Sequence, residues 1–200
     1  MQERKRDYFY NRAKEEHYRS RASYKLLQAV NKYHLIKYGD VVVDLGAAPG
    51  GWMQVAKKIV GNKGFVLGVD PKPIEPFPQD YVQALIGDMT EQETRQRIRK
   101  TIPRKVDVVI SDASPNISGI WEVDHARQID LAQHALGIAA ENLRQNGSVF
   151  VKVFQGDMLD DFVKKVKKCF EEVKVVKPQA SRAKSSEMYV LGLRFKGVVE

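Results

Sequence analysis

The sequence has 200 residues, which suit one domain with a complete core, and 43% of them are hydrophobic, as in globular rather than disordered proteins. The net charge of +8 favours a polyanionic partner, most commonly nucleic acid, although a merely soluble basic protein has the same composition. One cysteine excludes an internal disulfide, and neither an apolar leader nor a membrane-spanning run is present, so we expect a cytoplasmic protein with no membrane partner.

Residues 1–20 are predicted to form a basic arm. Basic and aromatic residues alternate through residue 25, with Arg4, Lys5, Arg6, Arg12, Lys14, Arg19, Arg21 and Lys25 beside Tyr8, Phe9, Tyr10, Tyr18 and Tyr24. Basic side chains bind phosphates and aromatic rings stack on unpaired bases, so the arm is a candidate RNA contact. A helical arm whose tyrosines pack on the body explains the same pattern.

Helical and strand patterns alternate after the arm. A helix is expected over residues 23–36, ended by Gly39, and others at 51 onward, 91–100, 123–144, where Asn146-Gly147 would form the cap, and 157–170. Strands are expected at 41–45, 65–70, 82–88, 106–112, 148–154, 173–176 and 188–195. This order predicts an α/β fold, a doubly wound, mostly parallel seven-stranded sheet with helices on both faces. No repeat or linker interrupts it, so residues 1–200 are expected to form a single domain.

The segment from Val41 to Trp52 has the features of a ligand-binding strand, turn and helix. Small residues let the backbone approach a ligand, and a helix beginning at Gly51 points unpaired N–H groups toward it. The glycines do not have the G-x-G-x-x-G spacing of the dinucleotide fingerprint, and Asp44, which precedes the first glycine, Gly46, would repel a pyrophosphate. A ligand with an amino group and a cationic sulfur suits the turn, so the predicted cofactor is S-adenosylmethionine. An NAD site and a purely structural junction are the alternatives.

Four acids stand where predicted strands end: Asp44, Asp70, Asp88 and Asp112. Ligands of open parallel sheets bind beyond these ends. Asp70 follows the first glycine at about the spacing at which an acid binds ribose hydroxyls, and Asp88 is placed to accept from an adenine amino group. Trp52 would lie beside the cofactor or in the core. A turn or helix-cap role explains any one of the acids taken alone.

Lys152 interrupts an apolar strand, where a lysine is costly unless its charge is paired or lost. A solvent-facing lysine on an edge strand is the alternative. Glu187 stands similarly before the strand at 188–195. If Lys25, Asp112, Lys152 and Glu187 converge, their alternating charges could orient and deprotonate a hydroxyl. The four histidines show no ligand spacing with cysteine or acid, so no metal site is expected.

Several blocks together carry a family resemblance: residues 20–26, Val43-Asp44-Leu45-Gly46-Ala47-Ala48-Pro49-Gly50-Gly51-Trp52, Ser111-Asp112, Pro115-Asn116-Ile117-Ser118-Gly119, Val151-Lys152-Val153-Phe154-Gln155-Gly156, and Lys177-Pro178 with Ser181-Arg182-Ala183 ahead of Glu187. The chain resembles the FtsJ/RrmJ family of RNA ribose 2′-O-methyltransferases, class I enzymes that use S-adenosylmethionine. Ser186 and Leu27-Gln28 depart from the bacterial members, which have an arginine and an acid there, and both departures concern substrate contacts.

The resemblance implies a Rossmann-like methyltransferase fold and a catalytic tetrad of Lys25, Asp112, Lys152 and Glu187. It also implies cofactor contacts at Gly50, Trp52, Asp70, Asp88 and Asp112, to which the glycine turn adds Asp44 and Gly46. Lys152 would accept the proton of the hydroxyl, which requires a neutral amine during turnover, or would only orient the hydroxyl.

The implied reaction is methyl transfer from S-adenosylmethionine to the 2′-hydroxyl of a uridine in 23S, large-subunit, ribosomal RNA, within the ribosomal subunit. A transfer-RNA methyltransferase of the same family is one alternative. A non-catalytic RNA-binding assembly factor is another, which the complete tetrad disfavours. We expect a monomer without an obligate protein partner.

Overall fold

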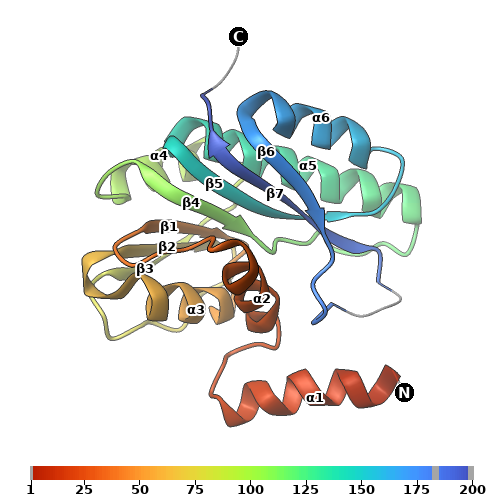
Figure 1. Cartoon of the computed structure of the whole chain (residues 1–200), viewed down its shortest axis with the longest axis horizontal. Helices are drawn as coiled ribbons and strands as arrows, with labels where there is room; N and C mark the ends of the chain where they lie inside the picture. The colour runs from red at the N-terminus through yellow and green to blue at the C-terminus, as the bar shows by residue number, and fades with distance from the viewer. Residues whose placement is uncertain (1, 182–184, 198–200) are drawn as a thin grey trace.

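A computed structural model describes residues 2–181 and 185–197, with side chains for residues 8–181 and 185–197 (Figure 1). These residues form a seven-stranded sheet with strand order β3-β2-β1-β4-β5-β7-β6. The strands are β1 Val41–Leu45, β2 Phe65–Asp70, β3 Val82–Ile86, β4 Val106–Ser111, β5 Leu143–Phe154, β6 Phe170–Val176 and β7 Glu187–Phe195. Strands β1 to β5 pair in parallel, and β7 runs antiparallel to β5 and β6. The predicted doubly wound, mostly parallel sheet is confirmed.

Helices cover both faces of the sheet (Figure 1). The described helices are α1 Gln2–Glu15, α2 Ser23–Tyr33, α3 Gly51–Val60, α4 Gln92–Thr101, α5 Trp121–Asn142 and α6 Leu159–Cys169, with a 3₁₀ turn at Gly61–Lys63. Helices α2 and α3 pack on one face, and α4, α5 and α6 pack on the other. Strands β1 and β4 are therefore buried along their whole length, as expected of parallel strands covered on both sides. No helix in the described ranges is long and apolar enough to cross a membrane.

The predicted cap at Asn146-Gly147 is wrong. Helix α5 ends at Asn142, and Leu143 already pairs with Val106 of β4. Asn146, with φ of 62°, lies inside β5 at a shift of register rather than beyond a helix. Sheet pairing therefore overrides a local turn signal, and the other element bounds differ from the predicted ones by a few residues.

The N-terminal helix α1 extends away from the sheet (Figure 1). Phe9 and Ala13 pack against Tyr24 of α2, whereas Tyr8 and Tyr10 are exposed. The helix thus has one face packed on the body and one aromatic face exposed, and the RNA contact of the arm stays a prediction. Three side chains of the predicted RNA contact lie outside the described ones: Arg4, Lys5 and Arg6.

Candidate active site

The carboxyl ends of the parallel strands open into a cavity of about 770 Å³. Asp70 at the end of β2, Asp88 after β3 and Asp112 after β4 line it, together with Gly46 of the turn after β1. Parallel strands end at one edge of the sheet, and so acids far apart in the sequence meet there. Three of the four strand-end acids thus share one cavity.

The turn after β1 allows two backbone segments to approach closely. Gly46 has φ of 73°, and a Cβ built on it would lie 2.6 Å from the Cα of Ala113, which follows β4. A larger residue would have to displace the segment that carries Asp112. The small residue at this position therefore fixes the spacing of the cavity walls, independently of any ligand.

Hydrogen bonds, most of them from backbone N–H groups, hold the carboxylates of Asp70 and Asp88 in the wall of the cavity. The Ala48 and Lys72 N–H groups donate to the two Asp70 oxygens at 3.0 and 2.8 Å. The Thr90 N–H and hydroxyl donate to Asp88 Oδ1 at 2.9 and 2.8 Å. A carboxylate oxygen can accept more than one hydrogen bond, so Asp70 and Asp88 keep the capacity to bind hydroxyl or amino groups of a ligand.

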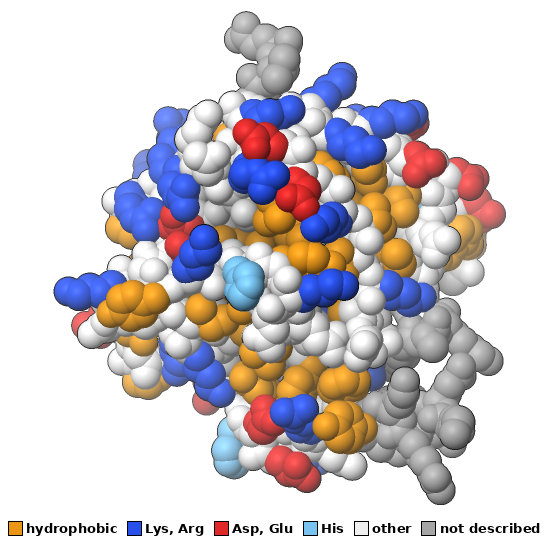
Figure 2. Space-filling view, viewed as in Figure 1, with side chains coloured by type: hydrophobic (Ala, Val, Ile, Leu, Met, Phe, Trp, Pro, Cys, Tyr) orange, Lys and Arg blue, Asp and Glu red, His pale blue; other side chains and the backbone are white. Residues whose placement is uncertain are grey.

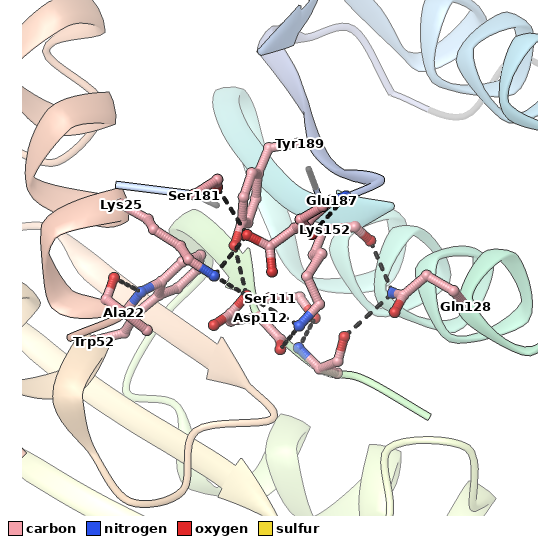
Figure 3. Close-up of polar contacts among 12 residues, drawn as sticks. Ala22, Lys25, Trp52, Ser111, Asp112, Gln128, Lys152, Ser181, Glu187 and Tyr189 are labelled. Carbon is pink, nitrogen blue, oxygen red and sulfur yellow. Dashed lines mark hydrogen bonds and ion pairs between the residues drawn. The ribbon is translucent and has the colours of Figure 1, made fainter. Parts of the chain in front are cut away.

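The four predicted catalytic side chains lie together at the edge of this cavity (Figure 3). Lys25 Nζ of α2 lies 2.6 Å from Glu187 Oε1 of β7 and 3.9 Å from Asp112 Oδ1. Lys152 Nζ of β5 lies 3.2 Å from Asp112 Oδ1 and donates to the Asp112 backbone carbonyl at 2.7 Å. Lys25 and Lys152 are only 8% and 6% exposed, so their charges are balanced locally by the two acids rather than by water.

Asp112 is an ionised carboxylate in a buried place. Burial alone would raise its pKa, but the charges of Lys152 and Lys25 and a 2.6 Å hydrogen bond from the Tyr189 hydroxyl outweigh burial and lower the pKa. Burial, and then the negative charges of Asp112 and Glu187, raises the pKa of Tyr189 well above its ordinary value. The phenol therefore stays protonated and keeps donating to Asp112.

Gln128 of α5 is a site residue that sequence reasoning missed. It is 1% exposed, and its Nε2 donates to the carbonyls of Lys152 at 3.0 Å and Ala113 at 3.2 Å (Figure 3). One amide thus joins β5 to the segment after β4. A polar residue in a long helix is ordinary in a sequence, so only the packing of α5 could reveal this contact.

Arg19 is a second missed residue. Its guanidinium donates to the carbonyls of Pro49 at 3.4 Å, Glu75 at 2.7 Å and Pro76 at 3.3 Å, and lies 4.0 Å from the centre of the Phe77 ring. The side chain therefore ties the glycine turn to the proline-rich loop at residues 71–79. Before the fold was known, Arg19 was one basic residue among many in the arm.

Asp44 does not line the cavity. It is fully buried in β1, and neither carboxylate oxygen has a hydrogen-bond partner among the described residues. Burial, and then the charges of Asp112 and Asp70, raises its pKa well above the ordinary value. A cofactor contact by Asp44 stays a prediction.

Trp52 and Gly50 are also not cavity-lining residues. The indole of Trp52 is 3% exposed, donates to the Ala22 carbonyl at 2.7 Å and lies beside Phe150 of the core. Gly50, with φ of 101°, precedes α3 and faces Arg19. Their predicted cofactor contacts likewise remain predictions.

The fold and site define the class of the protein: a Rossmann-like α/β protein whose cavity lies at the strand ends, beside a cluster of two lysines and two acids. No group of three side chains arranged to hold a metal occurs within the described residues. A model of the FtsJ-like methyltransferases matches residues 18–195. The chain belongs to this family, and the predicted resemblance is confirmed.

Relatives and solved structures agree with this assignment. The chain is 57% identical over 198 residues to the ribosomal RNA large subunit methyltransferase E of Methanocaldococcus jannaschii, covering 98% of this chain and 81% of the relative. The protein of that name from Methanothermobacter thermautotrophicus is 51% identical, with 98% and 92% covered. A crystal structure described as a ribosomal RNA methyltransferase of Plasmodium falciparum superposes with a TM-score of 0.80 at 26% identity, covering 90% of this chain and 100% of that one.

Proposed function

We propose that this chain transfers a methyl group from S-adenosylmethionine to a ribose 2′-hydroxyl of large-subunit ribosomal RNA, at a uridine. The observation that carries the proposal is the convergence of Lys25, Asp112, Lys152 and Glu187 beside a cavity that Asp112 itself lines. The names of the relatives support the class of RNA, since they are described as large-subunit ribosomal RNA methyltransferases.

The cavity fits the proposed cofactor. Its volume lies within the range of roughly 300–1,000 Å³ usual for ligand sites, and it presents the carboxylates of Asp70, Asp88 and Asp112. Such acceptors suit ribose hydroxyls, an adenine amino group and a cationic amino acid end. When bound, S-adenosylmethionine supplies a methyl group that is already a strong electrophile, so the protein has to position the hydroxyl and remove its proton.

Lys152 is the residue proposed to take that proton. Its two contacts with Asp112, one to the backbone carbonyl and one to the carboxylate, use two N–H groups. A neutral amine would then keep its lone pair for the ribose hydroxyl, whereas an ammonium would offer a third N–H to the hydroxyl oxygen. Lys152 would accept the proton of the ribose hydroxyl as the hydroxyl oxygen takes the methyl group that S-adenosylmethionine would supply. The Asp112 carboxylate stabilises the ammonium that results.

Lys25 and Glu187 hold the other side of the proposed site. Their 2.6 Å ion pair is supported by the Ser181 hydroxyl, which donates to Glu187 Oε1 at 2.8 Å. We further propose a monomer with a single domain over residues 1–200, whose basic arm at residues 1–20 contacts the RNA of the ribosomal subunit.

The test is transfer of labelled methyl groups from S-adenosylmethionine to purified large-subunit particles, free large-subunit RNA and transfer RNA, followed by mapping of methylated riboses. We expect incorporation at one ribose of large-subunit RNA, abolished by Lys152→Ala, whose RNA and cofactor affinities stay near those of the unaltered protein. Methylation of transfer RNA alone would replace the proposed substrate. Binding of both ligands without any transfer would indicate a non-catalytic factor.

A further inference from the structure

An exposed apolar surface lies at the start of α5 and takes no part in the proposed chemistry. Its large hydrophobic side chains, together called the Trp121 surface, are exposed by 36–63%: Ile117, Ile120, Trp121, Val123 and Met158. Single exposed hydrophobic residues are common, but their gathering in one place is typical of an interaction site.

The ring at the centre of this surface is held in place. Trp121 stacks on His125 with ring centres 5.7 Å apart and on Phe154 at 6.0 Å, and yet 44% of it is exposed. The backbone N–H of Met158 donates to His125 Nε2 at 3.2 Å, which holds the His125 ring against Trp121. Asp124 accepts hydrogen bonds of 2.7 and 3.1 Å from N–H groups of the loop before α5. A preorganised aromatic face loses little entropy when a ligand covers it.

The position of the surface connects it with the active site. Phe154, on which Trp121 lies, is two residues beyond Lys152 on β5 and pairs with Glu187 in the antiparallel register. The segment that joins Asp112 to the start of α5 also lines the cofactor cavity, at Ser114, Pro115 and Asn116. An RNA whose ribose reaches Lys152 would therefore have nucleotides close to Trp121.

We propose that the Trp121 surface stacks against an unpaired base next to the nucleotide that is methylated. This inference rests on the proposed function. Acidic residues neighbour this surface along the chain, namely Glu122, Asp157 and Asp160, and Figure 2 shows acidic side chains where α6 begins, on a face otherwise rich in basic ones. Acids repel phosphates, and so the contact is to the uncharged face of a base, as is usual for RNA read in single-stranded form.

The experiment measures RNA affinity against salt concentration for Trp121→Ala and Trp121→Phe. We expect Trp121→Ala to weaken binding about 5- to 150-fold, the usual worth of one base–aromatic stack. The loss should be the same at every salt concentration, because a stacking contact releases no counterions, and the slope of log affinity against log salt should not change. Trp121→Phe keeps a ring and should recover most of the affinity.

Tyr38→Ala is the matched control. Tyr38 is an exposed aromatic residue just before β1, at the amino ends of the parallel strands, whereas the site lies at their carboxyl ends. Its hydroxyl donates a hydrogen bond to Asn62 at 3.0 Å. The Tyr38→Ala variant should bind RNA like the unaltered protein, and all variants should bind S-adenosylmethionine equally. Unchanged RNA affinity in Trp121→Ala overturns the inference while methylation by the unaltered protein upholds the proposed function. A dimer that dissociates on Trp121→Ala, with RNA affinity intact, would assign the surface to a second copy instead. An unaltered protein that neither binds nor methylates RNA removes both proposals.

Discussion

Replacing Gln128 with leucine should separate positioning from folding. The substitution keeps the bulk of a side chain that is 1% exposed and removes the hydrogen bonds to the Lys152 and Ala113 carbonyls. Two buried hydrogen bonds are worth roughly 1–3 kcal/mol of unfolding free energy together. For a chain of this size that loss lowers the melting temperature by about 2–12 °C.

The effect on catalysis should be larger than the effect on folding. The two carbonyls belong to the elements that carry Lys152 and Asp112, and a misplacement near 1 Å costs on the order of a hundredfold in rate. We expect the single-turnover rate of methyl transfer to fall about a hundredfold. Cofactor affinity should change little, because Asp70 and Asp88 are held by other contacts.

Asn142→Leu provides the control on the same helix. Asn142 is also a buried amide of α5, and its side chain donates to the Ile138 carbonyl at 2.8 Å, far along the helix from the site. Both variants should lose stability, but only Gln128→Leu should lose rate when both are assayed well below their melting temperatures. A Gln128→Leu rate within threefold of the unaltered protein would refute the positioning role.

Four further outcomes are expected. Arginine stays protonated, so Lys152→Arg should lose at least about a hundredfold in single-turnover rate, and a rate within about tenfold would contradict the general base. Asp44→Asn should raise stability to urea, and the gain should grow as the pH rises from about 4. The raised pKa of Asp44 means that folding takes up a proton that the unfolded chain has released, and asparagine has no such cost. Equal gains at pH 4 and 8 would refute this. Arg19→Lys should weaken cofactor binding roughly tenfold by calorimetry, since an ammonium cannot reproduce the planar set of donors. Replacing the arm residues Arg4, Lys5 and Arg6 by alanine should flatten the salt dependence of RNA binding. The slope of log affinity against log salt should change by about 0.7–0.9 per residue.

The sheet and its ligand edge were predictable because short apolar runs and terminal acids are local signals. Strands β1 and β4 are rich in valine and isoleucine, and each is buried at every position. Parallel pairing then requires Asp70, Asp88 and Asp112 to share one edge. Lys152 stood out because it interrupts an apolar strand, but the assignment of all four residues to one site rested on the family resemblance, since nothing in the spacing of Lys25 and Glu187 places them 2.6 Å apart.

The residues that escaped prediction depend on tertiary packing. Trp52 looked suited to a cofactor or to the core, and its hydrogen bond to the Ala22 carbonyl could not be foreseen from the sequence. Gln128 and Arg19 bind backbone carbonyls, and which carbonyls come within reach is unknown until the chain is folded. The failed cap at Asn146-Gly147 has the same origin, because pairing of Leu143 with β4 extends β5 through that turn sequence.

Asp112 belongs to both halves of the proposed site, and this limits what its mutation can teach. The carboxylate lies against Lys152 and Lys25 and also lines the cavity in which the cofactor is proposed to bind. Asp112→Asn would change the charge at both places, so a loss of transfer could not be divided between binding and chemistry. Lys152 does not line that cavity, so Lys152→Ala removes a side chain of the tetrad and leaves the lining of the cavity in place. Cofactor affinity measured beside single-turnover rate in that variant therefore separates the proposed handling of the hydroxyl from cofactor binding.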